Sequence, residues 1–218
     1  MSISRSRLMS AIITLLAIFS LIDNRALADS TSLPAAEALI ELLRDGGYSL
    51  YFRHEATDWS QSDDIHKAGD WLSCDGRRIR QLSSSGRKRA TATGQAIQSL
   101  GIPIGKVLAS PYCRTLETAR LMNLGPVEST TDVINLRVAE YFGGRDAIVE
   151  TAKALLASTP DAETNTLIVS HGNVAREATP VYPEEGEGIV FQADGEGGFR
   201  LIGRLTAEDW KRIETGSP

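Results

Sequence analysis

The sequence contains the stretch Tyr48-Ser49-Leu50-Tyr51-Phe52-Arg53-His54, in which apolar and aromatic residues lead directly into an arginine and a histidine. Such residues favour strands, so the first part of the stretch predicts a buried β-strand. Open α/β sheets bind their ligands at the carboxyl ends of strands, and Arg53 and His54 lie at such an end. On its own, the stretch also fits a strand that merely ends in polar residues.

Two further stretches follow the same plan and favour a functional site. The run Leu167-Ile168-Val169-Ser170-His171-Gly172 brings a second histidine to the end of an apolar strand. The run Val107-Leu108-Ala109-Ser110-Pro111 leads within a few residues to Arg114. Two of the three histidines of the chain therefore lie at predicted strand ends.

Residues 1–28 have the parts of a secretory signal peptide. Arg5 and Arg7 form a positive start, an apolar core follows, and Ala26-Leu27-Ala28 is a small-x-small cleavage site. We expect cleavage before Asp29, a periplasmic or secreted protein, and no stable membrane anchor after cleavage. An uncleaved anchor is the alternative, although the apolar run is short and interrupted for a membrane span.

The remaining chain, residues 29–218, fits one domain that can bury a sizeable core. The net charge of the whole chain is −5 at pH 7. Nucleic-acid binding requires a basic face, so this acidic balance argues against a nucleic-acid partner.

Strand and helix patterns alternate along this domain. We expect strands over residues 48–52, 106–109 and 167–170, an antiparallel pair at 186–192 and 199–205, and helices over 34–44, 83–100 and 146–158, after Ser110 and near Thr206. Ser110 is expected to cap its helix, with Pro111 at the first helical position. Residues 55–80 are expected to form a long loop over the site. The alternation predicts an α/β fold: a single-domain three-layer αβα sandwich with a mostly parallel sheet and an antiparallel C-terminal edge.

Two arginines and two histidines at one sheet edge suit phosphoryl chemistry. Arginine forks match phosphate geometry, and neighbouring cations keep an imidazole neutral and nucleophilic near pH 7. A neutral histidine can form a phosphohistidine that water later hydrolyses, while a second, protonated histidine stabilises the developing charge. Zinc binding is the rival use of histidines, but only His66 remains as a third, without ligand spacing.

The motifs together resemble a known family. Arg53-His54, the run from Ser110 to Ala119 and Val169-Ser170-His171-Gly172, in this order, are similar to the histidine phosphatase superfamily, in its phosphoglycerate-mutase-like branch. The resemblance covers nearly all of residues 29–218.

The resemblance implies roles for individual residues. By this resemblance, His54 is the nucleophile, and Arg53 and Arg114 bind the phosphoryl group. His171 completes the pocket, and Gly172 lies beside the substrate. The resemblance also implies a phosphomonoesterase that acts on a small phosphorylated substrate without metal or cofactor. Sugar phosphates, envelope glycans, nucleotides and phosphoproteins would all present the same group.

One position departs from the family pattern. Glu55 follows the nucleophile where relatives often have glycine, and we expect it to alter substrate shape or pH response. A catalytically inactive phosphate-binding relative and a phosphoglycerate-type mutase remain alternatives to a phosphatase.

The leaving group needs a proton donor, for which Glu140 is the first candidate. The family resemblance places the acid in this part of the chain, and Tyr141 and Phe142 are expected to surround Glu140 and raise its pKa. Glu55 and Asp58, which follow the nucleophile closely, are the alternatives.

Cys74 and Cys113 are the only cysteines of the chain. In an exported protein an even pair is a disulfide candidate, and Cys113 immediately precedes Arg114. Two free, buried thiols are the alternative.

Overall fold

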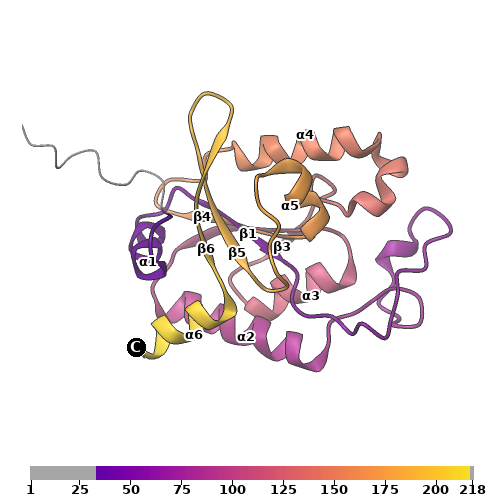
Figure 1. Ribbon diagram of the computed structural model, residues 1–218, viewed down its shortest axis with the longest axis horizontal. Helices are drawn as coiled ribbons and strands as arrows, with labels where there is room; N and C mark the ends of the chain where they lie inside the picture. Colours follow the sequence, from indigo (N-terminus) through magenta and orange to yellow (C-terminus); the bar gives the residue numbers. More distant parts are fainter. Residues whose placement is uncertain (1–32, 217–218) are drawn as a thin grey trace, which may run out of the picture. The chain divides into compact units, whose positions relative to one another are not determined.

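A computed structural model describes residues 33–216, in which one six-stranded sheet is flanked by helices (Figure 1). The strands are β1 (Ser49–Arg53), β2 (Ile104–Ala109), β3 (Val127–Ser129), β4 (Asn165–Ser170), β5 (Gly188–Ala193) and β6 (Phe199–Leu205). The α-helices are α1 (Ala36–Asp45), α2 (Ser84–Ser99), α3 (Cys113–Met122), α4 (Arg145–Leu156), α5 (Gly172–Ala178) and α6 (Ala207–Thr215). Two 3₁₀ helices, η1 (Asp70–Leu72) and η2 (Leu136–Phe142), lie in the connections.

The sheet has the order β3-β2-β4-β1-β5-β6. The first four of these strands run parallel, whereas β5 pairs antiparallel with β1 and β6 pairs antiparallel with β5. All five residues of β1 are buried, as expected for a strand that lies inside a sheet covered on both faces. Parallel pairing of β1 with β4 brings the carboxyl ends of these two strands side by side.

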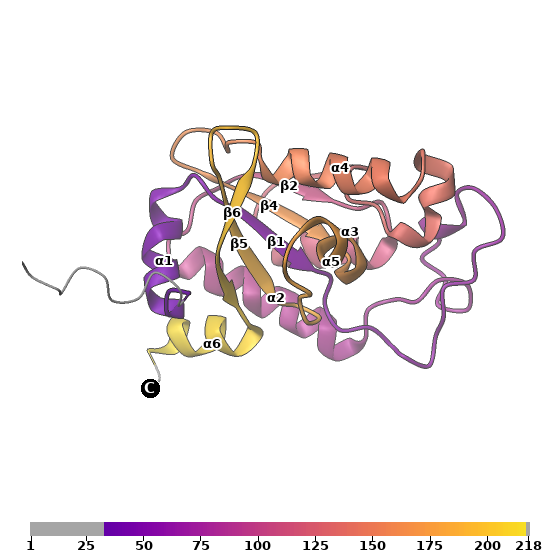
Figure 2. The same ribbon diagram turned by 45° about the horizontal axis from the view of Figure 1, so that its top comes forward.

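Helices cover both faces of the sheet, so the predicted three-layer αβα sandwich is confirmed (Figures 1 and 2). Alternate residues of β1 point to opposite layers: Tyr51 packs with α4, α5 and η2, whereas Leu50 and Phe52 pack with α1, α2, α3 and α6. The antiparallel edge is also as predicted, because β5 and β6 form a hairpin.

The local predictions around the third helix were wrong. Tyr112, not Ser110, precedes the first turn of α3, and Pro111 lies outside the helix. The Ser110 hydroxyl instead lies 2.9 Å from Nε2 of His171, which removes it from capping. The short strand β3 and the helix α5 were not predicted.

The long loop after β1 is present and carries one turn of 3₁₀ helix. Its two ends are held together by an antiparallel bridge between Thr57 and Leu82. The helix after the loop begins as predicted, because the Ser83 hydroxyl accepts a hydrogen bond from the backbone N–H of Gly86.

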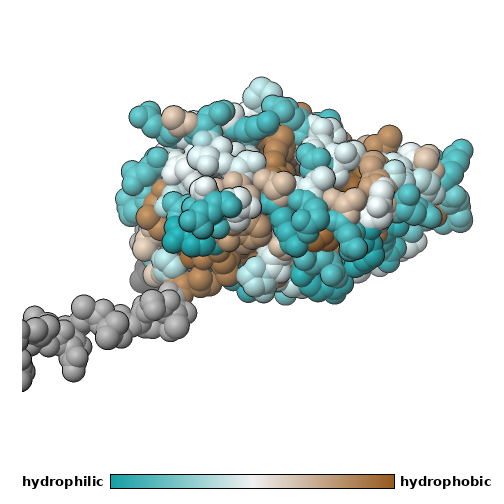
Figure 3. Space-filling model, turned by 90° about the horizontal axis from the view of Figure 1, so that it is seen from above, coloured by the Kyte–Doolittle hydropathy of each residue, from teal (hydrophilic) through white to brown (hydrophobic). Residues whose placement is uncertain are grey.

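The predicted signal peptide, residues 1–28, lies outside the described residues. Between residues 33 and 216, no helix is long and apolar enough to cross a bilayer. On the face shown in Figure 3, hydrophilic residues and smaller hydrophobic areas lie intermingled.

Candidate active site

The candidate site lies at the carboxyl ends of β1 and β4. Arg53 is the last residue of β1, and the backbone N–H of His54 donates to the carbonyl of Ser170 at 2.9 Å, which extends the parallel pairing by one residue. His171 follows β4 directly and caps α5. The imidazole rings of His54 and His171 are 5.6 Å apart, edge to face, and both residues are buried. The structure therefore brings the two predicted histidines together.

The ring of His54 has a defined tautomer. Its Nδ1 lies 2.9 Å from the carbonyl oxygen of Glu55, and because a carbonyl only accepts, Nδ1 carries the hydrogen. Nε2 then holds a free lone pair. Burial, followed by the positive charge of Arg114, lowers the pKa of His54 well below its usual range. His54 is therefore a neutral imidazole at neutral pH.

His171 is held by Ser110 through its Nε2, at 2.9 Å from the hydroxyl oxygen. The ring also packs edge to face on Tyr112, with 4.8 Å between centroids. Its Nδ1 is buried and has no hydrogen-bond partner within residues 33–216. Burial, then the charge of Arg114, lowers the pKa of His171 well below its usual range. The expectation of a protonated His171 is therefore wrong for the unliganded protein.

Arg114 forms a buried ion pair with Asp63, which was not predicted from the sequence. Its two terminal nitrogens donate to the two carboxylate oxygens of Asp63, at 2.9 and 3.1 Å. Nη1 also donates to the carbonyl of Arg80, and the guanidinium carbon lies 4.5 Å from the centroid of the Tyr112 ring. Asp63 is a loop residue without a periodic pattern around it, so only its place in the loop near the site could have suggested a role.

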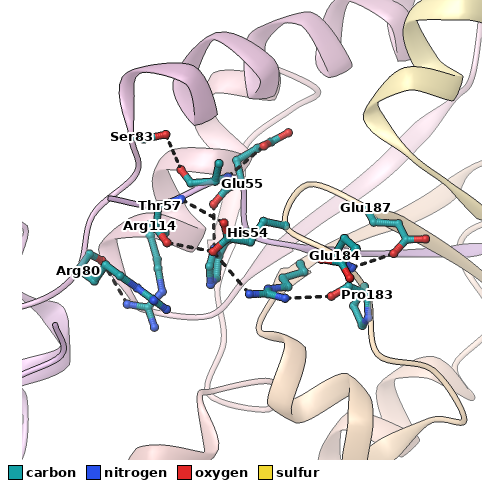
Figure 4. A network of polar contacts seen from close by, with 12 residues as sticks. His54, Glu55, Thr57, Arg80, Ser83, Arg114, Pro183, Glu184 and Glu187 are labelled. Atoms are coloured by element: carbon teal, nitrogen blue, oxygen red, sulfur yellow. Dashed lines mark hydrogen bonds and ion pairs between the residues drawn. The ribbon is translucent and has the colours of Figure 1, made fainter. Parts of the chain in front are cut away.

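Arg53 points its guanidinium toward the turn before β5. Nη1 donates to the carbonyl of Pro183 at 3.1 Å, and Nη2 lies 3.5 Å from a carboxylate oxygen of Glu185. Figure 4 shows His54 between the Arg80–Arg114 pair and the Pro183–Glu187 turn. Gly172 lies close to Arg53: an added Cβ would stand 3.2 Å from its Cδ and 2.9 Å from the ring of Tyr182.

A cavity of about 370 Å³ opens over these groups. Arg53, His54, Arg114, His171 and Gly172 all line it, so the structure collects these predicted residues around one space. Arg80 and Arg137 line it as well, and neither was predicted. Arg80 lies at the end of the loop, with its guanidinium 3.9 Å from the centroid of the Trp59 ring.

The structure does not place Glu140 in this cavity. Glu140 is exposed, because Val138 and Ala139 occupy the inward side of η2. Tyr141 and Phe142 do not enclose Glu140 as expected: their rings pack against Trp71, and Glu140 stays exposed although its side chain interacts with that of Tyr141.

Glu55 and Asp58 are also absent from the residues lining this cavity. The Glu55 side chain is buried against Gly186 and forms an ion pair with Arg89 at 2.7 Å. Burial raises the pKa of the Glu55 carboxyl, and Arg89 opposes this. Asp58 accepts hydrogen bonds from Ser60 and Gln61, which lower the pKa of its carboxyl. Among the cavity-lining residues that the structure describes, Asp63 is the only one with a carboxylate side chain.

The two cysteines form a disulfide between the loop and the start of α3. Cys74 and Cys113 have Cα atoms 5.4 Å apart. Because Arg114 follows Cys113 and Asp63 lies in the loop, the disulfide ties together the chain segments that carry the ion pair. Within residues 33–216, no group of three or more His, Cys, Asp or Glu side chains could hold a metal ion.

Comparison with solved structures shows similarity to phosphatases. The protein histidine phosphatase SixA, complexed with tungstate, has a TM-score of 0.50 and 13% identity, covering 74% of this chain and 98% of that one. The chain therefore shares its fold with this phosphatase. A phosphoserine phosphatase of Entamoeba histolytica with the same fold has a TM-score of 0.50 and 14% identity over 74% of this chain and 98% of its own. An open reading frame of Mycobacterium tuberculosis reaches 22% identity at a TM-score of 0.50, covering 74% and 98%.

Sequence comparisons add little to the fold. No protein-family model matches the sequence. An agropine synthesis reductase of Rhizobium rhizogenes is 29% identical over 147 residues, or 58% of this chain. The chain spans about a third (33%) of the length of that relative.

Proposed function

We propose that this protein is a metal-independent phosphomonoesterase that acts through a phosphohistidine on His54. The observation that carries the proposal is the neutral imidazole of His54, with Nδ1 bonded to a carbonyl and Nε2 free, in a cavity lined by Arg53 and Arg114. The similarity of fold to phosphatases supports it.

In the proposed reaction, Nε2 of His54 attacks the phosphorus atom of the substrate. A bond forms between Nε2 and phosphorus, the ester P–O bond breaks, and its electron pair goes to the leaving oxygen, which takes up a proton. Arg53 and Arg114 neutralise the phosphoryl oxygens, and His171 donates a hydrogen bond to them from Nδ1. Water then hydrolyses the phosphohistidine and releases phosphate.

We assign the proton transfer to Asp63 in place of Glu140. Asp63 lines the cavity, whereas Glu140 is exposed outside it. A bound phosphoryl group would take over donors of Arg114 that now bond to Asp63. This exchange frees an Asp63 oxygen, which takes up a proton from solvent as the substrate binds, gives it to the leaving oxygen and later takes one from the attacking water.

The test is hydrolysis of an aryl phosphate such as p-nitrophenyl phosphate by the purified protein. We expect turnover that persists after treatment with a chelator, is inhibited by vanadate, and is lost in His54→Ala. Arg53→Ala, Arg114→Ala and His171→Ala should each lose about two to three orders of magnitude in kcat, because a donor to developing charge contributes a few kcal/mol.

Three outcomes would contradict the proposal in different ways. Full activity in His54→Ala would exclude the phosphohistidine. Binding of phosphate without turnover would identify an inactive relative. Transfer of the phosphoryl group to a second substrate molecule in preference to water would identify a mutase.

A further inference from the structure

One residue of the nucleophile motif has no part in the reaction proposed above. Glu55 follows His54 where the family pattern often has glycine, and it does not line the cavity. Its side chain is fully buried, and Oε1 has no hydrogen-bond partner within residues 33–216. Because a buried ion pair often stabilises a fold no more than an apolar pair would, stability alone is a weak reason for a carboxylate at this position.

The Glu55 carboxylate holds the peptide group that sets the tautomer of His54 (Figure 4). The carbonyl of Glu55 and the N–H of Ala56 belong to one planar trans peptide group, in which they point in opposite directions. The carbonyl oxygen lies 2.9 Å from Nδ1 of His54, and the N–H donates to Oε2 of the Glu55 side chain at 3.1 Å. A bond from this N–H to a carboxylate also polarises the carbonyl and makes it a stronger acceptor. One peptide group therefore joins the nucleophile to the carboxylate.

Arg89 fixes the Glu55 carboxylate in this position. Its Nε and Nη2 lie 2.9 and 2.7 Å from Oε2, and Arg89 belongs to α2, outside the sheet. Gly186 packs against the same carboxylate and leaves no room for a Cβ. The side chain of Glu55 is therefore held from α2 and from the turn before β5, with Oε2 within reach of the Ala56 N–H.

Arg89 also bonds to the segment that holds Arg53. Its Nη2 donates to the carbonyl of Glu185 at 3.3 Å. The carboxylate of Glu185 lies 3.5 Å from Nη2 of Arg53 and accepts from the hydroxyl of Thr57 at 2.9 Å. A single side chain of α2 thus connects to both Arg53 and His54.

We propose that Glu55 and Arg89 are positioning residues for the nucleophile: the carboxylate, held by Arg89, fixes the peptide group that keeps the hydrogen of His54 on Nδ1. A neutral imidazole can carry its hydrogen on either nitrogen, and the hydrogen bond made by one nitrogen decides which. With the hydrogen on Nε2, that nitrogen could not attack phosphorus. This inference rests on the proposed function and deepens it.

The kinetics of p-nitrophenyl phosphate hydrolysis test the inference. Glu55→Ala removes the carboxylate, and Arg89→Gln removes its partner, a side chain that is 40% exposed. We expect kcat/KM to fall about 10- to 100-fold in Glu55→Ala and about tenfold in Arg89→Gln, since a small misplacement of a reacting group has effects of this size. The inhibition constant of inorganic phosphate should change much less, because the arginines that bind it remain. Glu55→Gln keeps an acceptor for the Ala56 N–H and should recover most of the loss.

Arg87→Gln is the matched control. Arg87 also belongs to α2, is 43% exposed, and pairs with Glu117 at 2.7 Å. This variant should keep the wild-type kcat/KM even if its urea midpoint falls as far as that of Arg89→Gln. Wild-type kcat/KM in the folded Arg89→Gln variant would overturn the inference, whether or not Glu55→Ala folds. An equal loss of kcat/KM in Arg87→Gln would overturn it as well.

Long-range proton–nitrogen NMR of the histidine-labelled protein reads the tautomer without turnover. The signals of His54 are those missing in His54→Ala. Wild type and Arg87→Gln should carry the hydrogen on Nδ1, whereas Glu55→Ala and Arg89→Gln should show a mixture of the two tautomers. An unchanged tautomer in both of these variants would overturn the inference.

The two readouts separate this inference from the proposed function. If the tautomer changes in Arg89→Gln but the wild-type protein hydrolyses no phosphate ester, the positioning role stands and the phosphatase function fails. If the wild-type protein hydrolyses p-nitrophenyl phosphate and Arg89→Gln changes neither kcat/KM nor the tautomer, the function stands and the inference fails.

Discussion

At the scale of single residues, the site keeps two histidines uncharged while placing arginines around them. The folded protein excludes water from His54 and His171, and the guanidinium of Arg114 disfavours a second positive charge beside it. An uncharged imidazole is what a nucleophile needs, but its burial also makes the folded state sensitive to acid.

Acid should destabilise the protein in the range where free histidine titrates. Both histidines have a pKa well below the ordinary value of 6.5, so below about pH 6.5 the unfolded chain binds protons that the folded chain does not. The free energy of unfolding should therefore fall as the pH falls from 6.5 to 5, by up to about 1.4 kcal/mol per pH unit for each histidine. Urea denaturation at several pH values measures this slope.

The slope should be smaller in His54→Asn, because this variant lacks one of the two buried imidazoles. Equal slopes in wild type and His54→Asn would show that His54 does not resist protonation in the folded state.

Replacing Asp63 should slow the hydrolysis of alkyl phosphates more than that of aryl phosphates. Asp63→Asn removes the proposed proton donor, so hydrolysis of glycerol 3-phosphate should fall by about 10²–10⁴-fold, while an activated aryl phosphate should be affected much less. Loss of the carboxylate also removes the group that competes with phosphate for Arg114, so the Kd of vanadate should decrease. Leaving-group dependence and vanadate binding are the two measurements.

Glu140→Gln provides the comparison for this prediction. Its exposed position predicts wild-type rates on both substrates. If Glu140→Gln shows the selective loss on alkyl phosphates and Asp63→Asn does not, the proton donor is Glu140, as the sequence resemblance suggested.

Sequence predicted those site residues that follow strands or belong to ordered motifs. Arg53, His54 and His171 stand directly after apolar runs, and the parallel pairing of β1 with β4 brings them together. Asp63, Arg80 and Arg137 come from irregular segments, where no period links position in the chain to position in space. Their contacts depend on how the connections close over the sheet.

At the scale of elements, the loop after β1 is held at three places. The Thr57–Leu82 bridge joins its ends, the Cys74–Cys113 disulfide ties it to α3, and Asp63 bonds to Arg114. The loop therefore positions the guanidinium of Arg114 from outside the sheet.

Breaking the disulfide should affect both stability and phosphate binding. The bond spans a sequence separation of 39 residues, for which the chain-entropy model gives about 4 kcal/mol as an upper figure. Cys74→Ser/Cys113→Ser should therefore unfold at lower urea concentration. KM should rise more than kcat falls, because the segments that carry Asp63 and Arg114 are no longer linked.

The wild-type protein under reducing conditions should match the double variant, and reductant should not change the double variant further. Identical urea midpoints for oxidised and reduced wild type would show that the disulfide does not stabilise the fold.

Element prediction succeeded where the hydrophobic pattern was long and failed where the element was short. The helices around residues 83–100 and 146–158 and the C-terminal hairpin were predicted close to their observed bounds. The three-residue β3 and the seven-residue α5 are too short for a periodic pattern. At α3, the cap signal of Ser110 was overridden by a tertiary contact, the hydrogen bond to His171.

At the scale of the whole molecule, the disulfide fits a protein that matures in an oxidising compartment. We predict that the signal segment, residues 1–28, is removed on export and that the mature chain begins at Asp29. Intact-mass measurement of the exported protein tests this, and a mass corresponding to all 218 residues, or a membrane-bound pool, would contradict it.

The order of strands in the sheet also governs when activity can arise during synthesis. Both strands that pair with β1, namely β4 and β5, come late in the sequence. The backbone N–H of Tyr48 donates to the side chain of Asn165, 117 positions further along. Until β4 emerges, β1 has no partner on either edge, and the loop closure required is long, so folding waits for the last quarter of the chain. Nascent or truncated chains that end before β4 should therefore contain His54 without the assembled site, and the phosphatase activity that we propose should appear only when the fold is complete.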